Sequence, residues 1–305
     1  MYGVTNMTNN SIAIYTNPAS IEISTNYNIW TDFGLSNFID ISVNVFNAPP
    51  IFSVTIFFPF IVSKGELTDL GPFYKNESIA TGIYDCPLTV QEIEGENYIA
   101  LLTNQGAPIA FIQLSDSNYS IKALDNSSSI IKYNITTPNN YKKVTFTFRI
   151  PFKSLTSQIH QVLANKRNWL DVIATPIMQR TLPFDFRVNE VRSLPSIIAR
   201  EAKSMHFKEQ RFFINVPNDI EVDRLNSVKV RNIETDIFKE YFPSKCYKNG
   251  GLCYMWKKNS ASSSVFSTVL VYKKWSIQSI CFYLSIISLI NIICGILVNL
   301  LFLFK

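Results

Sequence analysis

Histidine and the common catalytic motifs are nearly absent from this 305-residue chain. It contains two histidines, His160 and His206, and no nearby spacing of cysteines or carboxylates completes a metal site around either one. The sequence also has no G-x-S-x-G, P-loop, G-x-G-x-x-G or C-x-x-C pattern. We therefore expect no enzyme activity, no metal and no cofactor.

Cysteine is also scarce, with five in the chain. Cys281 and Cys294 lie in an apolar segment, and the other three are not the even, dense set of a secreted scaffold. The first twenty residues lack the basic and apolar regions of a secretory signal. A reducing compartment is therefore expected. The alternative is a glycosylated ectodomain, which would use the N-x-S/T sequons at Asn6, Asn9, Asn76, Asn118, Asn126 and Asn134.

One stretch, residues 275–304, contains no Asp, Glu, Lys or Arg. A membrane-spanning helix needs about 20 mainly apolar residues, so this stretch predicts one transmembrane helix in a tail-anchored protein whose partner is the lipid bilayer. Basic residues precede it at Lys257, Lys258, Lys273 and Lys274. Because cytoplasmic flanks are enriched in Lys and Arg, we expect residues before the helix on the cytoplasmic side of the inner (plasma) membrane, with the C-terminus across it.

The predicted span carries small and polar residues along one helical stripe. This polar stripe consists of Gln278, Cys281, Ser285, Ser288, Asn291, Gly295 and Asn299. Small residues allow close helix packing, and Ser or Asn side chains hydrogen-bond between helices. The stripe therefore predicts a homo-oligomer, in which it either forms the helix contact or lines a pore. A lone anchor with a polar composition is the alternative.

The rest of the chain predicts an α+β, β-rich fold. Residues 1–150 are expected to form a β-rich region and residues 151–274 an α+β part, either as two domains or as one. Short apolar or alternating segments predict strands at 20–24, 39–46, 51–62, 79–84, 98–103, 108–114, 144–150, 182–188, 210–216 and 265–272. Helices are expected at 154–175, 195–206 and 236–242. Strands this closely spaced favour an antiparallel sandwich or a partly open barrel.

A hairpin is expected just before the last strand. Asn249-Gly250 favours a two-residue turn, which would place Cys246 opposite Cys253. The two could form a cross-strand disulfide, although its geometry is demanding. Two ordinary thiols are the alternative.

Basic and aromatic residues are interleaved near the middle of the second half. Lys203, Lys208, Arg211 and Phe212 are the candidate ligand-binding residues, because such mixtures bind nucleotides or oligonucleotides. A solvated face over a sheet core is the alternative. The net charge is +5, and the basic residues are too widely spread to predict sequence-specific nucleic-acid binding.

In this layout, a β-rich cytosolic body is joined to a polar-striped C-terminal helix. The arrangement resembles bacterial defence proteins in which a cytosolic sensing domain is tied to a membrane-disrupting helix. The resemblance covers architecture alone and carries over no residues. It implies an antiviral effector whose body senses a ligand and controls an oligomeric pore or ion channel. The alternatives are a membrane-tethered binding or structural protein without a pore, and a surface or viral glycoprotein.

Overall fold

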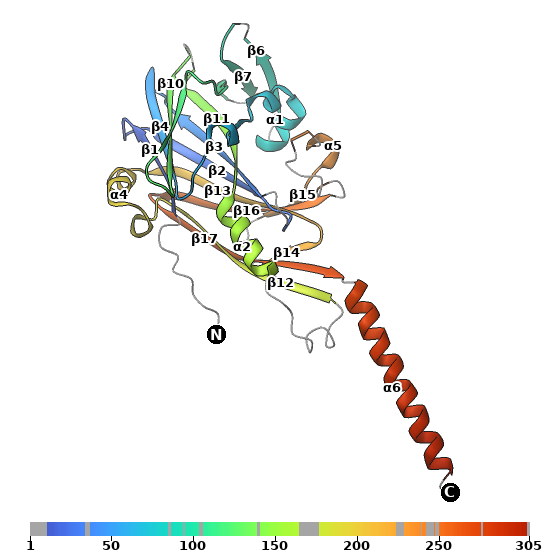
Figure 1. The fold of residues 1–305 in the computed structure, drawn as a ribbon. Helices are drawn as coiled ribbons and strands as arrows, with labels where there is room; N and C mark the ends of the chain where they lie inside the picture. The colour runs from blue at the N-terminus through green and yellow to red at the C-terminus, as the bar shows by residue number, and fades with distance from the viewer. Residues whose placement is uncertain are drawn as a thin grey trace.

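The computed structural model contains two open β-sheets packed face to face, with one long helix projecting from them (Figure 1). The structure describes residues 11–33, 37–84, 87–93, 95–103, 106–138, 141–164, 177–223, 229–238, 240–241, 247, 250–275 and 277–303. Within these ranges, the predicted β-rich α+β fold is confirmed, and its sheets are open and pack as a sandwich rather than as the partly open barrel that was the alternative.

The smaller sheet has seven strands. In spatial order they are β14 (Ile220–Val222), β17 (Ser264–Trp275), β12 (Ile177–Val188), β1 (Ser11–Asn17), β4 (Ile51–Phe58), β10 (Ser129–Thr136) and β9 (Tyr119–Ala123). Its centre is the parallel pair formed by β1 and β12, which come from opposite halves of the chain.

The larger sheet has ten strands. In spatial order they are β15 (Lys229–Asn232), β16 (Gly251–Ala261), β13 (Phe207–Pro217), β2 (Glu22–Trp30), β3 (Phe38–Phe46), β11 (Lys143–Pro151), β8 (Ile109–Ile112), β7 (Tyr98–Thr103) and β6 (Leu88–Glu92), with β5 (Thr68–Asp69) paired to β11. Here β2 pairs in parallel with β13. Both sheets therefore combine strands from before and after residue 150.

The main core lies between the two sheets. Tyr27 of the ten-stranded sheet contacts Phe186 of the seven-stranded sheet, with ring centroids 5.2 Å apart. Phe212 stacks on Phe266 at 5.6 Å. Because side chains alternate across each strand, one face of every central strand supplies this core. The core therefore unites the two halves of the chain.

Helices α1 (Glu77–Tyr84), α2 (Lys153–Ala164), α4 (Ser196–Lys203) and α5 (Thr235–Phe238) pack on the sandwich, whereas α6 (Ile277–Leu303) projects from it (Figure 1). The 3-10 turns are η1 (Lys64–Glu66), η2 (Gly71–Lys75) and η3 (Val191–Ser193). Elements α1, η2 and α5 share a second core on the ten-stranded sheet. Helix α4 packs on β1 and β4 through a third core.

The predicted strand at 79–84 is wrong, because these residues belong to α1. The Asn76 side-chain oxygen accepts hydrogen bonds from the backbone N–H groups of Ser78 and Ile79, at 3.0 and 3.4 Å. This is the capping interaction that starts a helix. Ile79 and Ala80 then lie on the buried face of the helix. The apolar run at 79–84 is too short to distinguish the repeat of a helix from that of a strand, so the sequence predicted the wrong element.

Part of the hairpin predicted around Asn249-Gly250, including Asn249, lies outside the described residues. Strand β16 begins at Gly251, and at Cys253 its two neighbours are Asn215 of β13 and Arg231 of β15. Both edges of β16 at Cys253 are therefore occupied by other strands. Cys253 is a free, buried thiol, and Cys246 lies outside the described residues.

Most of the other predicted elements are confirmed, with shifted ends. Pro195 precedes α4, but the helix stops at Lys203 rather than continuing to residue 206. Helix α2 begins one residue before the predicted start, and the part of that predicted helix after residue 164 lies outside the described residues. Strand β1 was not predicted, because most of its side chains on both faces are buried and the alternating pattern is lost.

Candidate functional site

Helix α6 projects away from the sandwich without packing on it (Figure 1). Its segment Ile280–Leu300 is long and apolar enough to cross a membrane, and none of its most apolar window is buried inside the protein. Leu289 and Ile292 are 57% and 59% exposed. A surface this apolar is stable only when lipid or another protein covers it. The predicted helix in this part of the chain is confirmed, and it could span a membrane.

The polar stripe lies on α6. Cys281, Ser285, Ser288, Asn291, Gly295 and Asn299 are all exposed, whereas the side chain of Gln278 lies outside the described residues. The Ser285 hydroxyl donates to the carbonyl oxygen of Cys281 at 2.8 Å, as serines do in apolar helices. A side-chain carbon added at Gly295 would meet no atom within 4 Å. The stripe is therefore free to contact something outside this chain.

Strand β17 holds the base of α6. It pairs with β12 from Ser264 to Trp275 and with β14 on its other edge. The Lys273 ammonium lies 2.7 Å from the Glu221 carboxylate of β14. A single residue separates the end of β17 from the start of α6, so the helix leaves directly from a paired strand.

Two of the four predicted membrane-proximal lysines lie at this junction. Lys273 and Lys274 are at the end of β17, although the side chain of Lys274 is not described. Lys257 and Lys258 are on β16, near the turn that begins β17. Lys257 pairs with Glu209, and Lys258 donates to the carbonyl oxygen of Ser263 at 3.0 Å. They therefore lie toward the opposite end of β17 from α6.

The four candidate ligand-binding residues do not form one surface. Lys203 is on α4, over the seven-stranded sheet. Lys208 lies 3.6 Å from the Glu22 carboxylate, and Arg211 pairs with Glu209. Phe212 points into the main core, where it stacks on Tyr27. Arg211 and Phe212 are neighbours on one strand and therefore point to opposite faces.

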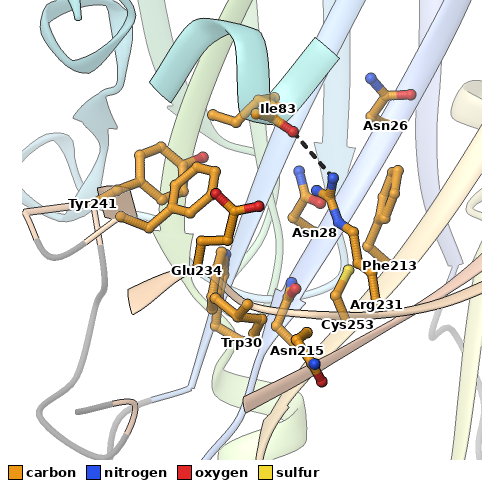
Figure 2. Close-up of a pocket in the computed structure, with 14 residues that line it drawn as sticks. Asn26, Asn28, Trp30, Ile83, Phe213, Asn215, Arg231, Glu234, Tyr241 and Cys253 are labelled. Carbon is orange, nitrogen blue, oxygen red and sulfur yellow. Dashed lines mark hydrogen bonds between the residues drawn. The ribbon is translucent and has the colours of Figure 1, made fainter. Parts of the chain in front are cut away.

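A polar pocket lies on the outer face of the ten-stranded sheet, and the sequence did not predict it. Strand pairing aligns Trp30 with Asn215, Asn215 with Cys253, and Cys253 with Arg231. The next row on the same face pairs Asn28 with Phe213. Side chains in such rows lie within reach of each other. Four distant segments therefore supply one pocket (Figure 2).

The rim of this pocket comes from α1, β15 and α5. The Arg231 guanidinium donates to the carbonyl oxygen of Gly82 at 3.1 Å, joining β15 to α1 (Figure 2). Phe238 of α5 lies against Gly82 so closely that an added side-chain carbon would be 2.6 Å from its ring. Burial raises the pKa of the Cys253 thiol, and contact with Arg231 partly opposes this. The thiol at the floor is therefore held in its neutral form.

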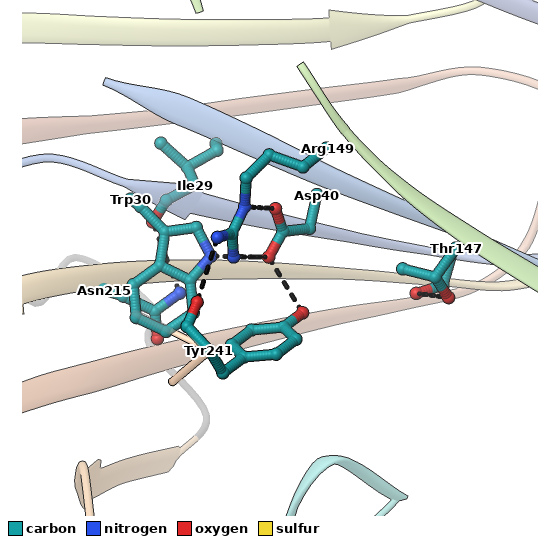
Figure 3. A network of polar contacts seen from close by, with 8 residues as sticks. Ile29, Trp30, Asp40, Thr147, Arg149, Asn215 and Tyr241 are labelled. Carbon is teal, nitrogen blue, oxygen red and sulfur yellow. Dashed lines mark hydrogen bonds and ion pairs between the residues drawn. The ribbon is translucent and has the colours of Figure 1, made fainter. Parts of the chain in front are cut away.

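A buried ion pair lies beside the pocket. The Arg149 guanidinium donates to both carboxylate oxygens of Asp40, at 2.6 and 2.8 Å (Figure 3). The same carboxylate accepts from the Trp30 indole at 2.7 Å and from the Tyr241 hydroxyl at 2.9 Å. Burial lowers the pKa of Arg149, but the Asp40 carboxylate outweighs it and holds the pKa above its ordinary value. This network fixes Trp30 and Tyr241, which both line the pocket.

Histidine has no part in either site. His160 and His206 are exposed on α2 and after α4. Among the residues that the structure describes, no group of three or more His, Cys, Asp and Glu side chains could hold a metal ion.

Comparisons with known proteins add little to this picture. No protein family and no curated protein matches the chain. Among solved structures, a putative protease from Parabacteroides distasonis ATCC 8503 is 9% identical, with a TM-score of 0.26; the match covers 86% of this chain and 40% of that one. Baculovirus P35 is 10% identical, with a TM-score of 0.22, over 86% of this chain and 94% of that one. Likenesses this weak carry no argument about function.

Proposed function

We propose that this chain is a single-pass membrane protein in which α6 anchors a β-rich binding module to the bilayer. The observation that carries the proposal is the uncovered apolar surface of α6, which continues directly from β17. Lipid is the natural cover for such a helix, because all its backbone groups are satisfied internally. The pocket on the ten-stranded sheet gives the anchored body a binding role.

We place the body on the cytoplasmic side of the inner (plasma) membrane. Lys273 and Lys274 precede α6, and the positive-inside bias retains such flanks in the cytoplasm. Expression in eukaryotic cells followed by glycosidase treatment tests this orientation. The sequons at Asn76, Asn126 and Asn134 are on the exposed surface of the body, so they would be modified if the body were lumenal. A loss of mass on treatment would reverse the orientation.

The anchor is tested by introducing charge into α6. Ile290→Lys should release protein from membranes during alkaline extraction, since a lysine near mid-span costs about 2.5–3.5 kcal/mol on insertion scales and Ile290 is at the centre of the candidate span Ile280–Leu300. Ile197→Lys is the matched control, because Ile197 is an equally large apolar residue that is 70% exposed on α4. Full extraction of the unsubstituted chain would exclude the anchor.

A second candidate function is an oligomeric α6 that permeabilises the membrane, as in an antiviral pore-forming effector. The specific observation in its favour is the polar stripe, which contacts nothing in the described part of the chain. Asn291→Leu and Gly295→Leu should reduce both crosslinking between copies and dye entry into expressing cells. Leu297→Ala, on the opposite side of α6, should not. Equal behaviour of all three variants would leave α6 as a plain anchor.

A further inference from the structure

The pocket on the ten-stranded sheet has amide groups without partners. Asn26 and Asn28 are half-buried on β2, and neither side chain makes a hydrogen bond with any residue in the described ranges. In Figure 2 the Asn28 amide lies beside Arg231, and Asn26 lies farther along the same strand. Both amides are still reached by water, because neither is among the fully buried polar atoms that lack a partner, and an amide group can both donate and accept a hydrogen bond. These amides are therefore available to a ligand.

The charges around the pocket cancel. Its lining contains one guanidinium, Arg231, and one carboxylate, Glu234, and every other lining group is neutral. Glu234 is exposed at the rim and forms no ion pair with a described residue. Because the two charges cancel, the lining has no net attraction for an anion or a cation, and either would lose hydration on entry. The electrostatics therefore favour a neutral ligand.

The apolar lining includes aromatic rings. Phe213 is half-buried and forms part of one side. Trp30 lies under the floor, where it is 5% exposed and packs against Tyr241 and Tyr247. Such rings provide flat apolar surfaces, while asparagine amides both donate and accept hydrogen bonds. The combination matches a molecule with C–H groups on its faces and hydroxyls around its edge.

The size of the pocket fits one small ring. Its volume is about 70 Å³, several times the about 10–15 Å³ that a cavity needs to hold one water and well below the about 300–1,000 Å³ of a pocket for a drug-sized ligand. The enclosed part of the pocket therefore takes no more than one small ring of a ligand. Longer chains would have to extend past Arg231 and Glu234 into solvent.

We propose that this pocket binds one ring of a neutral sugar, with Asn26 and Asn28 hydrogen-bonded to its hydroxyls and Phe213 against one of its faces. The inference deepens the binding role proposed above. It is independent of the membrane anchor, because sugar binding and alkaline extraction are measured separately. A failure of one therefore does not mimic a failure of the other.

The test is saturation-transfer NMR on the full chain in a polyoxyethylene detergent, which carries neither sugar nor charge. The probes are the methyl glycosides of glucose, mannose and galactose, with glucuronate as the anion and glycine betaine as the zwitterion. At least one methyl glycoside should receive saturation. Asn28→Leu and Asn26→Leu should each reduce the signal at least fivefold, with unfolding temperatures close to that of the parent.

Asn259→Leu is the matched control, because Asn259 is an exposed asparagine on the same face of the same sheet, outside the pocket. It should leave the signal unchanged. Saturation of none of the three glycosides would overturn the proposal, as would an equal loss in Asn259→Leu. Saturation of glycine betaine or glucuronate alone would replace the neutral sugar by a charged ligand and equally refute it.

Discussion

The Asp40–Arg149 pair is expected to be the most sensitive polar contact in the sandwich. The Asp40 side chain is fully buried and that of Arg149 is 10% exposed. Replacing Arg149 by Met leaves the carboxylate with only the Trp30 and Tyr241 donors. Removing one partner of a buried pair costs about 3–5 kcal/mol. For a body of this size that corresponds to a fall in Tm of about 6–20 °C.

A double-mutant cycle separates the charge pair from simple packing damage. Asp40→Asn keeps an oxygen that can accept from Trp30, but it leaves the Arg149 charge uncompensated. Combining it with Arg149→Met removes both charges, so the double variant should be more stable than the sum of the single effects by about 2 kcal/mol. The unfolding temperature of the full chain in detergent, followed by near-ultraviolet circular dichroism, measures the three variants.

The exposed ion pair between Lys64 and Asp116 is the control, with side chains 60% and 75% exposed. Lys64→Met should leave the unfolding temperature unchanged, because water already solvates both charges. The reasoning is refuted if the Asp40 and Arg149 effects add within about 0.5 kcal/mol. It is also refuted if Arg149→Met is as mild as Lys64→Met.

Two further predictions concern other parts of the body. Burial raises the pKa of the Asp69 carboxyl from 3.8 to about 6, against hydrogen bonds from the N–H groups of Gly71 and Leu114. The protonated Asp69 therefore stabilises the fold below pH 4, and this stabilisation, about 3 kcal/mol in all, is lost as the pH rises through 6. Between pH 4 and 7 the Tm of Asp69→Asn should fall less than the Tm of the parent. An equal fall in Tm for both proteins would contradict this. Gly82→Ala should lower Tm through its clash with Phe238, by an overpacking cost of about 1–3 kcal/mol, while Gly65→Ala, which has open space, should not.

Elements with a strong local period were predictable. Strand β3 was expected at 39–46 and occupies Phe38–Phe46, because one face meets the core and the other meets mostly polar groups. The helix expected at 275–304 runs from Ile277 to Leu303. Its start is later because Trp275 still pairs with Ile177 in the sheet. The local sequence shows the repeat of a helix or a strand. It does not show which other strand pairs with the element, and that pairing decides where the element ends.

The pocket was not predictable in the same way. Its floor depends on pairing β2 with β13 and β13 with β16, strands that lie far apart in the chain. The one local signal was the alternation Asn26-x-Asn28-x-Trp30, which places two amides and an indole on one face of a strand. Nothing in the sequence specified that Arg231 would lie in the row of Trp30. The predicted ligand-binding residues included Arg211 and Phe212, which are adjacent on β13. Neighbouring residues on a strand point to opposite faces of the sheet, so these two cannot line one site.

The chain also runs from the pocket to α6 by way of two different sheets. Cys253 at the pocket floor lies on β16 of the ten-stranded sheet, which passes into β17 of the seven-stranded sheet through the two residues between Ala261 and Ser264, and β17 leads to α6. Strand β17 is paired with β12 along its whole length, so it cannot shift without breaking that ladder. The body therefore fixes the direction in which α6 leaves it.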